Sequence, residues 1–168
     1  FKDCRRLRTL AGMDAFSPSE PYSFQGCRSL LSLEGGWGDG FGGVFGKRIF
    51  EGCESLLDLG GIPSSLTTLG VASFLGCRSL VDISALASTG VTTLPDKCFM
   101  DCPSIASLDG LSAVTAIGDD CFNGSVLLSS FDGTSDVLET VGARNFRNSA
   151  FSTFEGSPSG LIYVGEEC

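Results

Sequence analysis

The sequence predicts a repeat solenoid of about seven coils, each roughly 24 residues long. Three observations predict it. A phenylalanine is followed at fixed intervals by a cysteine and two further apolar residues, in the pattern F-x-x-C-x-x-L-x-x-L/I. A half-motif, L-x-x-L/I-G-x-x-x-F, precedes several of these phenylalanines. Cutting the chain before each such phenylalanine gives units of 23 to 26 residues that together account for all 168 residues.

The units start at residues 1, 24, 50, 74, 99, 122 and 146. The first five carry the cysteine of the pattern, whereas Ser125 and Ser149 replace it in the last two. One unit alone cannot bury its apolar residues, but stacked units bury them against each other. We therefore expect residues 1–168 to form a single domain with a substantial core.

Each coil is expected to contain short strands and one tight turn. The L-x-x-L/I step is too short for a helix and is rich in β-branched residues, as at residues 91–94, which favours short strands. The F-x-x-C-x-x-L step has apolar residues at i, i+3 and i+6, which predicts a helical or 3₁₀ turn. Glycines mark the corner between strand and turn, where a positive φ is inexpensive for glycine. They are Gly70, Gly118, Gly142 and Gly165.

The combined pattern, seen clearly from Leu66 to Leu80, resembles the BspA-like (Treponema-type) leucine-rich repeats over essentially the whole chain. Unit two departs from it through a glycine-rich insertion, and units six and seven lack the cysteine. Members of that family are mostly secreted or surface-displayed proteins of bacteria and protists, linked to adhesion and cell contact. The resemblance implies an extracellular or cell-surface location, with glycans or cell-surface proteins as partners.

The composition excludes several classes of function. The formal net charge is −9, which argues against electrostatic binding of nucleic acid or anionic membrane. The chain contains no histidine, so it has no Ser-His-Asp or Cys-His nucleophile and no histidine-containing zinc site. No apolar run approaches the roughly 20 residues that a membrane span needs. We expect no enzyme activity, no cofactor and no metal, and we expect the chain to be a mature, processed or excised piece.

The cysteines fall into two classes by position. Five share the internal position of the repeat and are expected to stack as buried thiols that act as small hydrophobes: Cys4, Cys27, Cys53, Cys77 and Cys102. Cys98 and Cys121 directly precede a phenylalanine on adjacent units, and a separation of roughly 5 Å is compatible with a disulfide. Cys168 is either free or faces Cys4 of another molecule.

Two further features have both a functional and a structural interpretation. The insertion at residues 35–46 holds the single tryptophan, Trp37, together with Phe41. It is either a binding loop on a rigid scaffold or a long corner whose Trp37 and Phe41 plug the core. The tripeptide Asn123-Gly124-Ser125 is either an N-glycosylation site, in a secretory host, or simply a turn.

The two ends of the chain are apolar and carry no evident polar caps, which solenoids need for solubility. The N-terminal face is expected to consist of Phe1, Cys4, Leu7 and Leu10. The C-terminal face is expected to consist of Leu161, Tyr163, Val164 and Cys168. Two hypotheses follow for a non-catalytic extracellular scaffold. Unlike faces of separate molecules join head to tail into a filament, or the chain is part of a longer surface protein that acts in adhesion or ligand binding.

Overall fold

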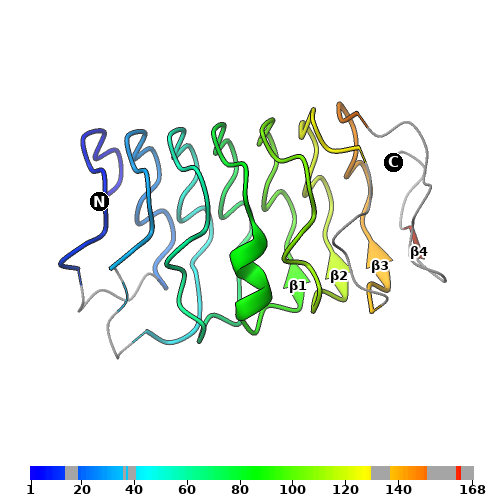
Figure 1. Cartoon of the computed structure of the whole chain (residues 1–168), viewed down its shortest axis with the longest axis horizontal. Helices are drawn as coiled ribbons and strands as arrows, with labels where there is room; N and C mark the ends of the chain where they lie inside the picture. Colours follow the sequence, from blue (N-terminus) through cyan, green and yellow to red (C-terminus); the bar gives the residue numbers. More distant parts are fainter. Residues whose placement is uncertain (14–18, 36, 38–40, 130–136, 151–161, 164–168) are drawn as a thin grey trace.

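The computed structural model describes residues 1–13, 19–35, 37, 41–129, 137–150 and 162–163. The chain winds into successive coils that lie side by side, from the N-terminal coil at one end to the C-terminal coil at the other (Figure 1). The predicted solenoid is confirmed.

Four two-residue strands form a parallel sheet in the order β1-β2-β3-β4 (Figure 1). They are β1 (Thr93–Leu94), β2 (Ala116–Ile117), β3 (Thr140–Val141) and β4 (Ile162–Tyr163). Each strand comes from the predicted L-x-x-L/I step of its coil, and isolated parallel bridges pair Val44 with Thr68 and Asp58 with Asp82. The helix in the described residues is a 3₁₀ helix, η1 (Ser84–Ser88). No described helix is long and apolar enough to cross a membrane.

The phenylalanines of the repeat form a continuous stack through the core. Successive rings from Phe1 to Phe122 have centroids 5.3–5.6 Å apart and planes within 13° of parallel. The separation exceeds the thickness of a ring, so the rings are offset, as aromatic pairs prefer. Columns of buried leucine and isoleucine run beside this stack, for example Leu30, Leu56 and Leu80.

The F-x-x-C-x-x-L step forms the predicted tight turns, which do not join into a continuous helix. In the coil of Phe74, the N–H of Cys77 donates to the carbonyl of Phe74, and the N–H of Leu80 donates to that of Cys77, both at 3.1 Å, which is the i→i+3 pattern of a 3₁₀ turn. Gly76, the third residue of the first turn, has φ +72°, and a residue in the left-handed region prevents a continuous right-handed helix. The same conformation recurs two residues before the phenylalanine, at Ala72 with φ 59°. The pattern is repeated in the neighbouring coils.

The coils are joined by a directional ladder of backbone hydrogen bonds. On the phenylalanine side, alternate N–H groups donate to carbonyls of the following coil, as from Phe50 to Ser73 at 2.8 Å and from Gly52 to Leu75 at 2.8 Å. On the opposite side the direction reverses, and the N–H of Val81 donates to Leu57 of the preceding coil at 2.9 Å. Toward the following coil, a coil therefore presents N–H donors on the phenylalanine side and carbonyl acceptors on the opposite side.

The corner glycines are needed for close approach and not for a positive φ. Gly70, Gly118 and Gly142 do not lie in the left-handed region. A Cβ built on Gly70 would lie 2.5 Å from both the carbonyl carbon of Gly46 and the nitrogen of Lys47 in the preceding coil. Real Cβ atoms do not approach backbone that closely, so the expected reason for these glycines is wrong. Gly165 lies outside the described residues.

Candidate functional site

The first coil presents an apolar face at the N-terminal end of the solenoid. Phe1 is 53% exposed, and its ring stacks on that of Phe24 with centroids 5.4 Å apart. Cys4 is exposed and Leu7 is half-buried. Leu10 is 1% exposed, so the expectation that it belongs to the exposed face is wrong. The chain turns directly after Leu10, where the N–H of Met13 donates to its carbonyl at 3.1 Å.

The same coil has hydrogen-bond donors without acceptors among the described residues. In several later coils the equivalent N–H groups donate to the preceding coil, as from Ser79 to Glu54 at 3.2 Å and from Val81 to Leu57 at 2.9 Å. Arg6 and Arg8 have no such acceptor among the residues described. The first coil is therefore an open edge of the kind that pairs with a further strand-like segment.

The expected C-terminal face falls mostly outside the described residues, which exclude Leu161, Val164 and Cys168. Tyr163 lies in β4, where it pairs in register with Val141. The C-terminal face therefore stays a prediction.

Four of the five internal cysteines are buried as predicted, and their thiols donate to the preceding coil: Cys27, Cys53, Cys77 and Cys102. Cys4 is exposed, so the expectation that it is buried is wrong, because no described coil precedes the first one. The Sγ atoms of Cys53, Cys77 and Cys102 lie 3.2–3.3 Å from the carbonyl oxygen of the phenylalanine one coil earlier. All three are buried free thiols. Burial in an apolar core raises the pKa of the Cys77 thiol well above its usual value, so the thiol stays protonated and unreactive.

Ser125 occupies the cysteine position in unit six but does not make this contact. Its hydroxyl is fully buried and has no hydrogen-bond partner among the described residues. A hydroxyl oxygen is held closer to Cβ than a thiol sulfur, so it does not reach the neighbouring carbonyl. An unsatisfied buried hydroxyl costs free energy, which explains why cysteine is used at this position.

A reciprocal pair of substitutions tests this account. We expect Ser125→Cys to raise the free energy of unfolding by about 1 kcal/mol, and Cys77→Ser to lower it by about 1–3 kcal/mol. Urea denaturation under reducing conditions measures both. Cys4→Ser is the matched control, because Cys4 is exposed and surface substitutions change stability by about 0.5 kcal/mol or less. Equal losses in Cys77→Ser and Cys4→Ser would contradict the role of the thiol contact.

Cys98 and Cys121 are buried free thiols in the structure, and their side chains interact with each other. Burial raises the pKa of Cys98 well above its usual value, and the side chain of Cys121 contributes to the shift. A disulfide between them stays a prediction, which intact mass before and after reduction checks.

Asn123 is held inside a polar network and is only 8% exposed. Its amide nitrogen donates to Asp120 Oδ1 at 3.0 Å, and its amide oxygen accepts from Asn148 at 3.3 Å. Arg144 donates to both oxygens of Asp120, at 3.0 and 2.7 Å. The folded chain thus uses the amide nitrogen that a glycan needs, and the structure favours the structural interpretation of the tripeptide over N-glycosylation.

The Asp120–Arg144 pair makes stability depend on acid pH. Hydrogen bonding to Arg144 holds the pKa of Asp120 below its usual value. A lowered folded-state pKa means that the stabilisation is complete above the unfolded pKa, about 3.9, and is lost as the pH falls through the folded pKa. We expect the wild type to lose more stability than Asp120→Asn between about pH 5 and pH 2. Urea midpoints measured across that range check it, and parallel curves would contradict the prediction.

Trp37 and Phe41 pack against the core, as the second interpretation of the insertion expects. Their rings lie 5.1 and 5.6 Å from the ring of Phe45, and the Trp37 indole N–H donates to the carbonyl of Gly61. In the other coils a buried aliphatic residue such as Leu66 stands eight residues before the phenylalanine, but here that position is Gly42. Both aromatic side chains therefore fill a gap in the core while staying half-buried, and a recognition role for them stays a prediction.

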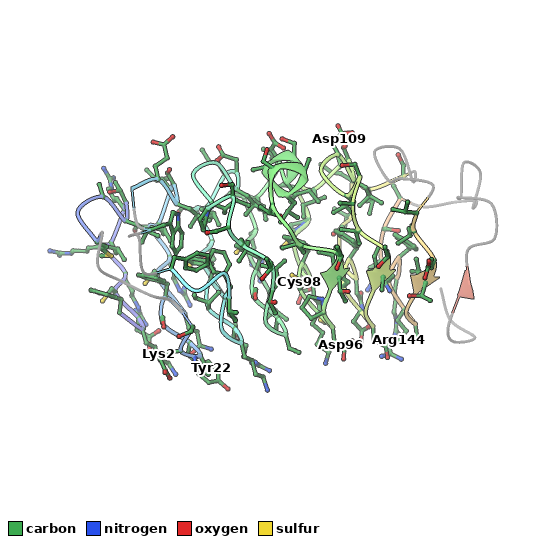
Figure 2. The ribbon with its side chains drawn as sticks, turned by 90° about the horizontal axis from the view of Figure 1, so that it is seen from below. Lys2, Tyr22, Asp96, Cys98, Asp109 and Arg144 are labelled. Carbon is green, nitrogen blue, oxygen red and sulfur yellow. The ribbon has the colours of Figure 1, made fainter. Side chains whose placement is uncertain are left out.

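A lateral groove that the sequence did not reveal crosses several coils on the side marked by Asp109, away from Asp96 and Arg144 (Figure 2). Its walls include Glu34, Asp58, Asp82 and Asp109. The only signal for it in the sequence was an apolar residue directly after a core leucine in three successive units: Leu31, Leu57 and Val81.

The described residues bring together no set of three or more histidine, cysteine, aspartate or glutamate side chains that would hold a metal. A family model of the BspA type leucine rich repeat region matches residues 43–168 with six copies. The chain belongs to the BspA-type leucine-rich repeat family. Proteins of this kind are typically non-catalytic binding proteins.

One solved structure similar to this BspA-type chain is a leucine-rich repeat protein from Bacteroides ovatus ATCC 8483. The two chains are 24% identical in sequence, and their structures match with a TM-score of 0.55. The match covers 98% of this chain and 52% of the Bacteroides chain. The chain thus spans about half the length of that protein, and at this identity the likeness shows the fold alone. No curated protein is similar enough to count as a relative.

Proposed function

We propose that this chain is a non-catalytic extracellular structural scaffold whose first coil accepts a further repeat coil from a second copy. The observation that carries the proposal is the 53% exposure of Phe1, whose ring stacks on Phe24 with planes 5° apart. A ring from a second copy that packs on the exposed part of Phe1 would continue the column. Burying a side chain of this size contributes about 1.5–3 kcal/mol.

The open backbone edge supports the same partner. The N–H groups of Arg6 and Arg8, which have no acceptor among the described residues, match the carbonyl groups through which several coils accept from their successor, such as those of Arg28 and Leu57. The exposed thiol of Cys4 stands where the other cysteines donate to the preceding coil. A coil of the same repeat satisfies these donors at the spacing already used inside the molecule.

Charge favours a partner from the other end of the chain. The first eight residues carry four basic side chains and one acidic side chain, Asp3, although the chain as a whole has a net charge of −9. The basic ones are Lys2, Arg5, Arg6 and Arg8. Residues 130–168 hold six acidic and two basic residues. Opposite charge at the two ends steers unlike ends together and disfavours the joining of like ends. Contacts between unlike faces build open filaments.

Sedimentation velocity over a range of concentrations, with electron microscopy of the same samples, tests the proposal. We expect the wild type to form chains whose length grows with concentration and falls with salt. Phe1→Asp should remain a monomer, whereas Val71→Asp, a change at a 38% exposed side chain on another coil, should assemble as the wild type does. A wild type that stays monomeric at high concentration would refute the self-assembly.

A second candidate function is adhesion or ligand binding by a longer surface protein of which this chain is a part. The coverage of only 52% of the Bacteroides protein favours it. In that case a coil of the same polypeptide would cover Phe1. Intact mass of the natural protein separates the two: a mass near 17.5 kDa, with any attached sugar, supports the filament, and a much larger mass supports the second candidate.

A further inference from the structure

We propose that the lateral groove binds a basic amphipathic helix of a partner protein, laid along the axis of the solenoid. This site is separate from the first coil and does not depend on self-assembly. It combines an exposed apolar row with a line of carboxylates that crosses the same coils.

The apolar row consists of Leu31, Leu57 and Val81, which are 43%, 49% and 54% exposed. They occupy the same position in three successive coils, directly after the buried leucine of each. The ladder bond from Val81 N–H to the Leu57 carbonyl, at 2.9 Å, holds two of them in register. Scattered exposed apolar residues need no explanation, but an aligned row beside a groove is typical of an interaction surface.

The carboxylates run beside this row. Glu34, Asp58 and Asp82 line one part of the groove, and Val81, Asp82 and Asp109 line the next. Leu57 directly precedes Asp58 in the chain, as Val81 directly precedes Asp82, so the carboxylates follow the apolar row from coil to coil. Asp58 and Asp82 each use one oxygen to accept a backbone N–H two residues later, at 2.8 and 2.7 Å. These bonds fix both carboxylates in place beside the apolar row.

The spacing of the coils selects a helix over an extended segment. Successive coils repeat at 5.3–5.6 Å along the phenylalanine stack. An α-helix has a pitch of about 5.4 Å, so one side chain per turn meets one coil. Same-face side chains of a strand repeat at about 6.7 Å and drift out of step by about 3 Å over two coils. Three apolar residues at positions i, i+4 and i+7 of a partner helix therefore match the spacing of the apolar row.

Charge defines the flank of the helix. Lysine or arginine side chains of the partner helix, spaced one helical turn apart, would face the four carboxylates of the groove. The apolar stripe of the same helix would cover Leu31, Leu57 and Val81. An acidic helix would place like charges together and is rejected. The groove therefore specifies the sequence pattern of its partner: an apolar stripe with a basic row on one side.

Fluorescence anisotropy with labelled designed peptides of about 20 residues tests the proposal. We expect saturable binding of a peptide with a leucine stripe and a lysine flank, and none of its glutamate-flanked counterpart or of a scrambled peptide with the same composition. The double variant Leu57→Ser/Val81→Ser should weaken binding at least about tenfold. Glu34→Gln/Asp109→Asn should weaken it severalfold and reduce its dependence on salt.

Val71→Ser is the matched control, since Val71 is an exposed apolar side chain outside the groove, and its affinity should equal that of the wild type. Equal urea midpoints for all variants show that the fold is kept. The proposal is overturned if the wild type binds no lysine-flanked peptide, if the scrambled peptide binds equally well, or if the groove variants keep the wild-type affinity.

Discussion

Gly70→Ala is expected to lower the free energy of unfolding by about 3 kcal/mol or more, whereas Gly76→Ala, in the same coil, should cost about 1 kcal/mol. The Cβ at residue 70 would meet backbone atoms of Gly46 and Lys47 at 2.5 Å, so neighbouring coils must separate. The Cβ at residue 76 would lie 3.9 Å or more from its neighbours. Its cost comes only from the left-handed φ of +72°.

Urea denaturation of the two variants beside the wild type measures this difference. Ala72 supplies an internal reference, because an alanine already occupies the left-handed region there with φ 59° while fully buried. The solenoid therefore tolerates a Cβ at such a position at moderate cost. If Gly76→Ala proved as destabilising as Gly70→Ala, backbone conformation and not contact between coils would be the reason for glycine in this repeat.

The repeat pattern predicted the buried columns well, because burial in a solenoid follows directly from spacing. The position shared by Phe24, Phe50 and Phe74 is buried in every one of these coils, and the cysteine three residues later packs beside it. Each coil is placed by contacts with its two neighbours, so a period in the sequence becomes a column in space.

The repeat pattern did not predict the role of residues at positions where a coil departs from its neighbours. Trp37 fills a gap that Gly42 leaves, and this compensation depends on packing in three dimensions. The role of Asn123 depends on Asp120 and Asn148, of which the latter lies one coil away. Leu10 has the spacing of an exposed end residue but is buried.

The lateral groove escaped prediction for a related reason. Periodic apolar residues were assigned to the core, but Leu57 follows the core residue Leu56 directly and points outward. Two adjacent apolar residues in a strand-like step face opposite sides. Comparison of this one position across successive coils would have separated the exposed row from the buried one.

Phe74→Ala is expected to lower the free energy of unfolding by about 3–5 kcal/mol, the range for removing a large aromatic side chain from a core. The ring of Phe74 is fully buried and stacks between Phe50 and Phe99, with centroids 5.5 and 5.3 Å away. Phe1→Ala is the matched control, because that ring stacks on Phe24 but is 53% exposed. It should cost about 1 kcal/mol.

The shape of the urea transition carries further information. The stability of a solenoid is approximately the sum of terms from single coils and from the contacts between neighbours. A cavity at residue 74 weakens two of these contacts at once, those with the coils of Phe50 and Phe99. We therefore expect the wild type to unfold in one transition and Phe74→Ala to unfold in two, as the parts on either side separate. A single transition in Phe74→Ala, shifted no further than in Phe1→Ala, would show that the phenylalanine stack does not couple the coils.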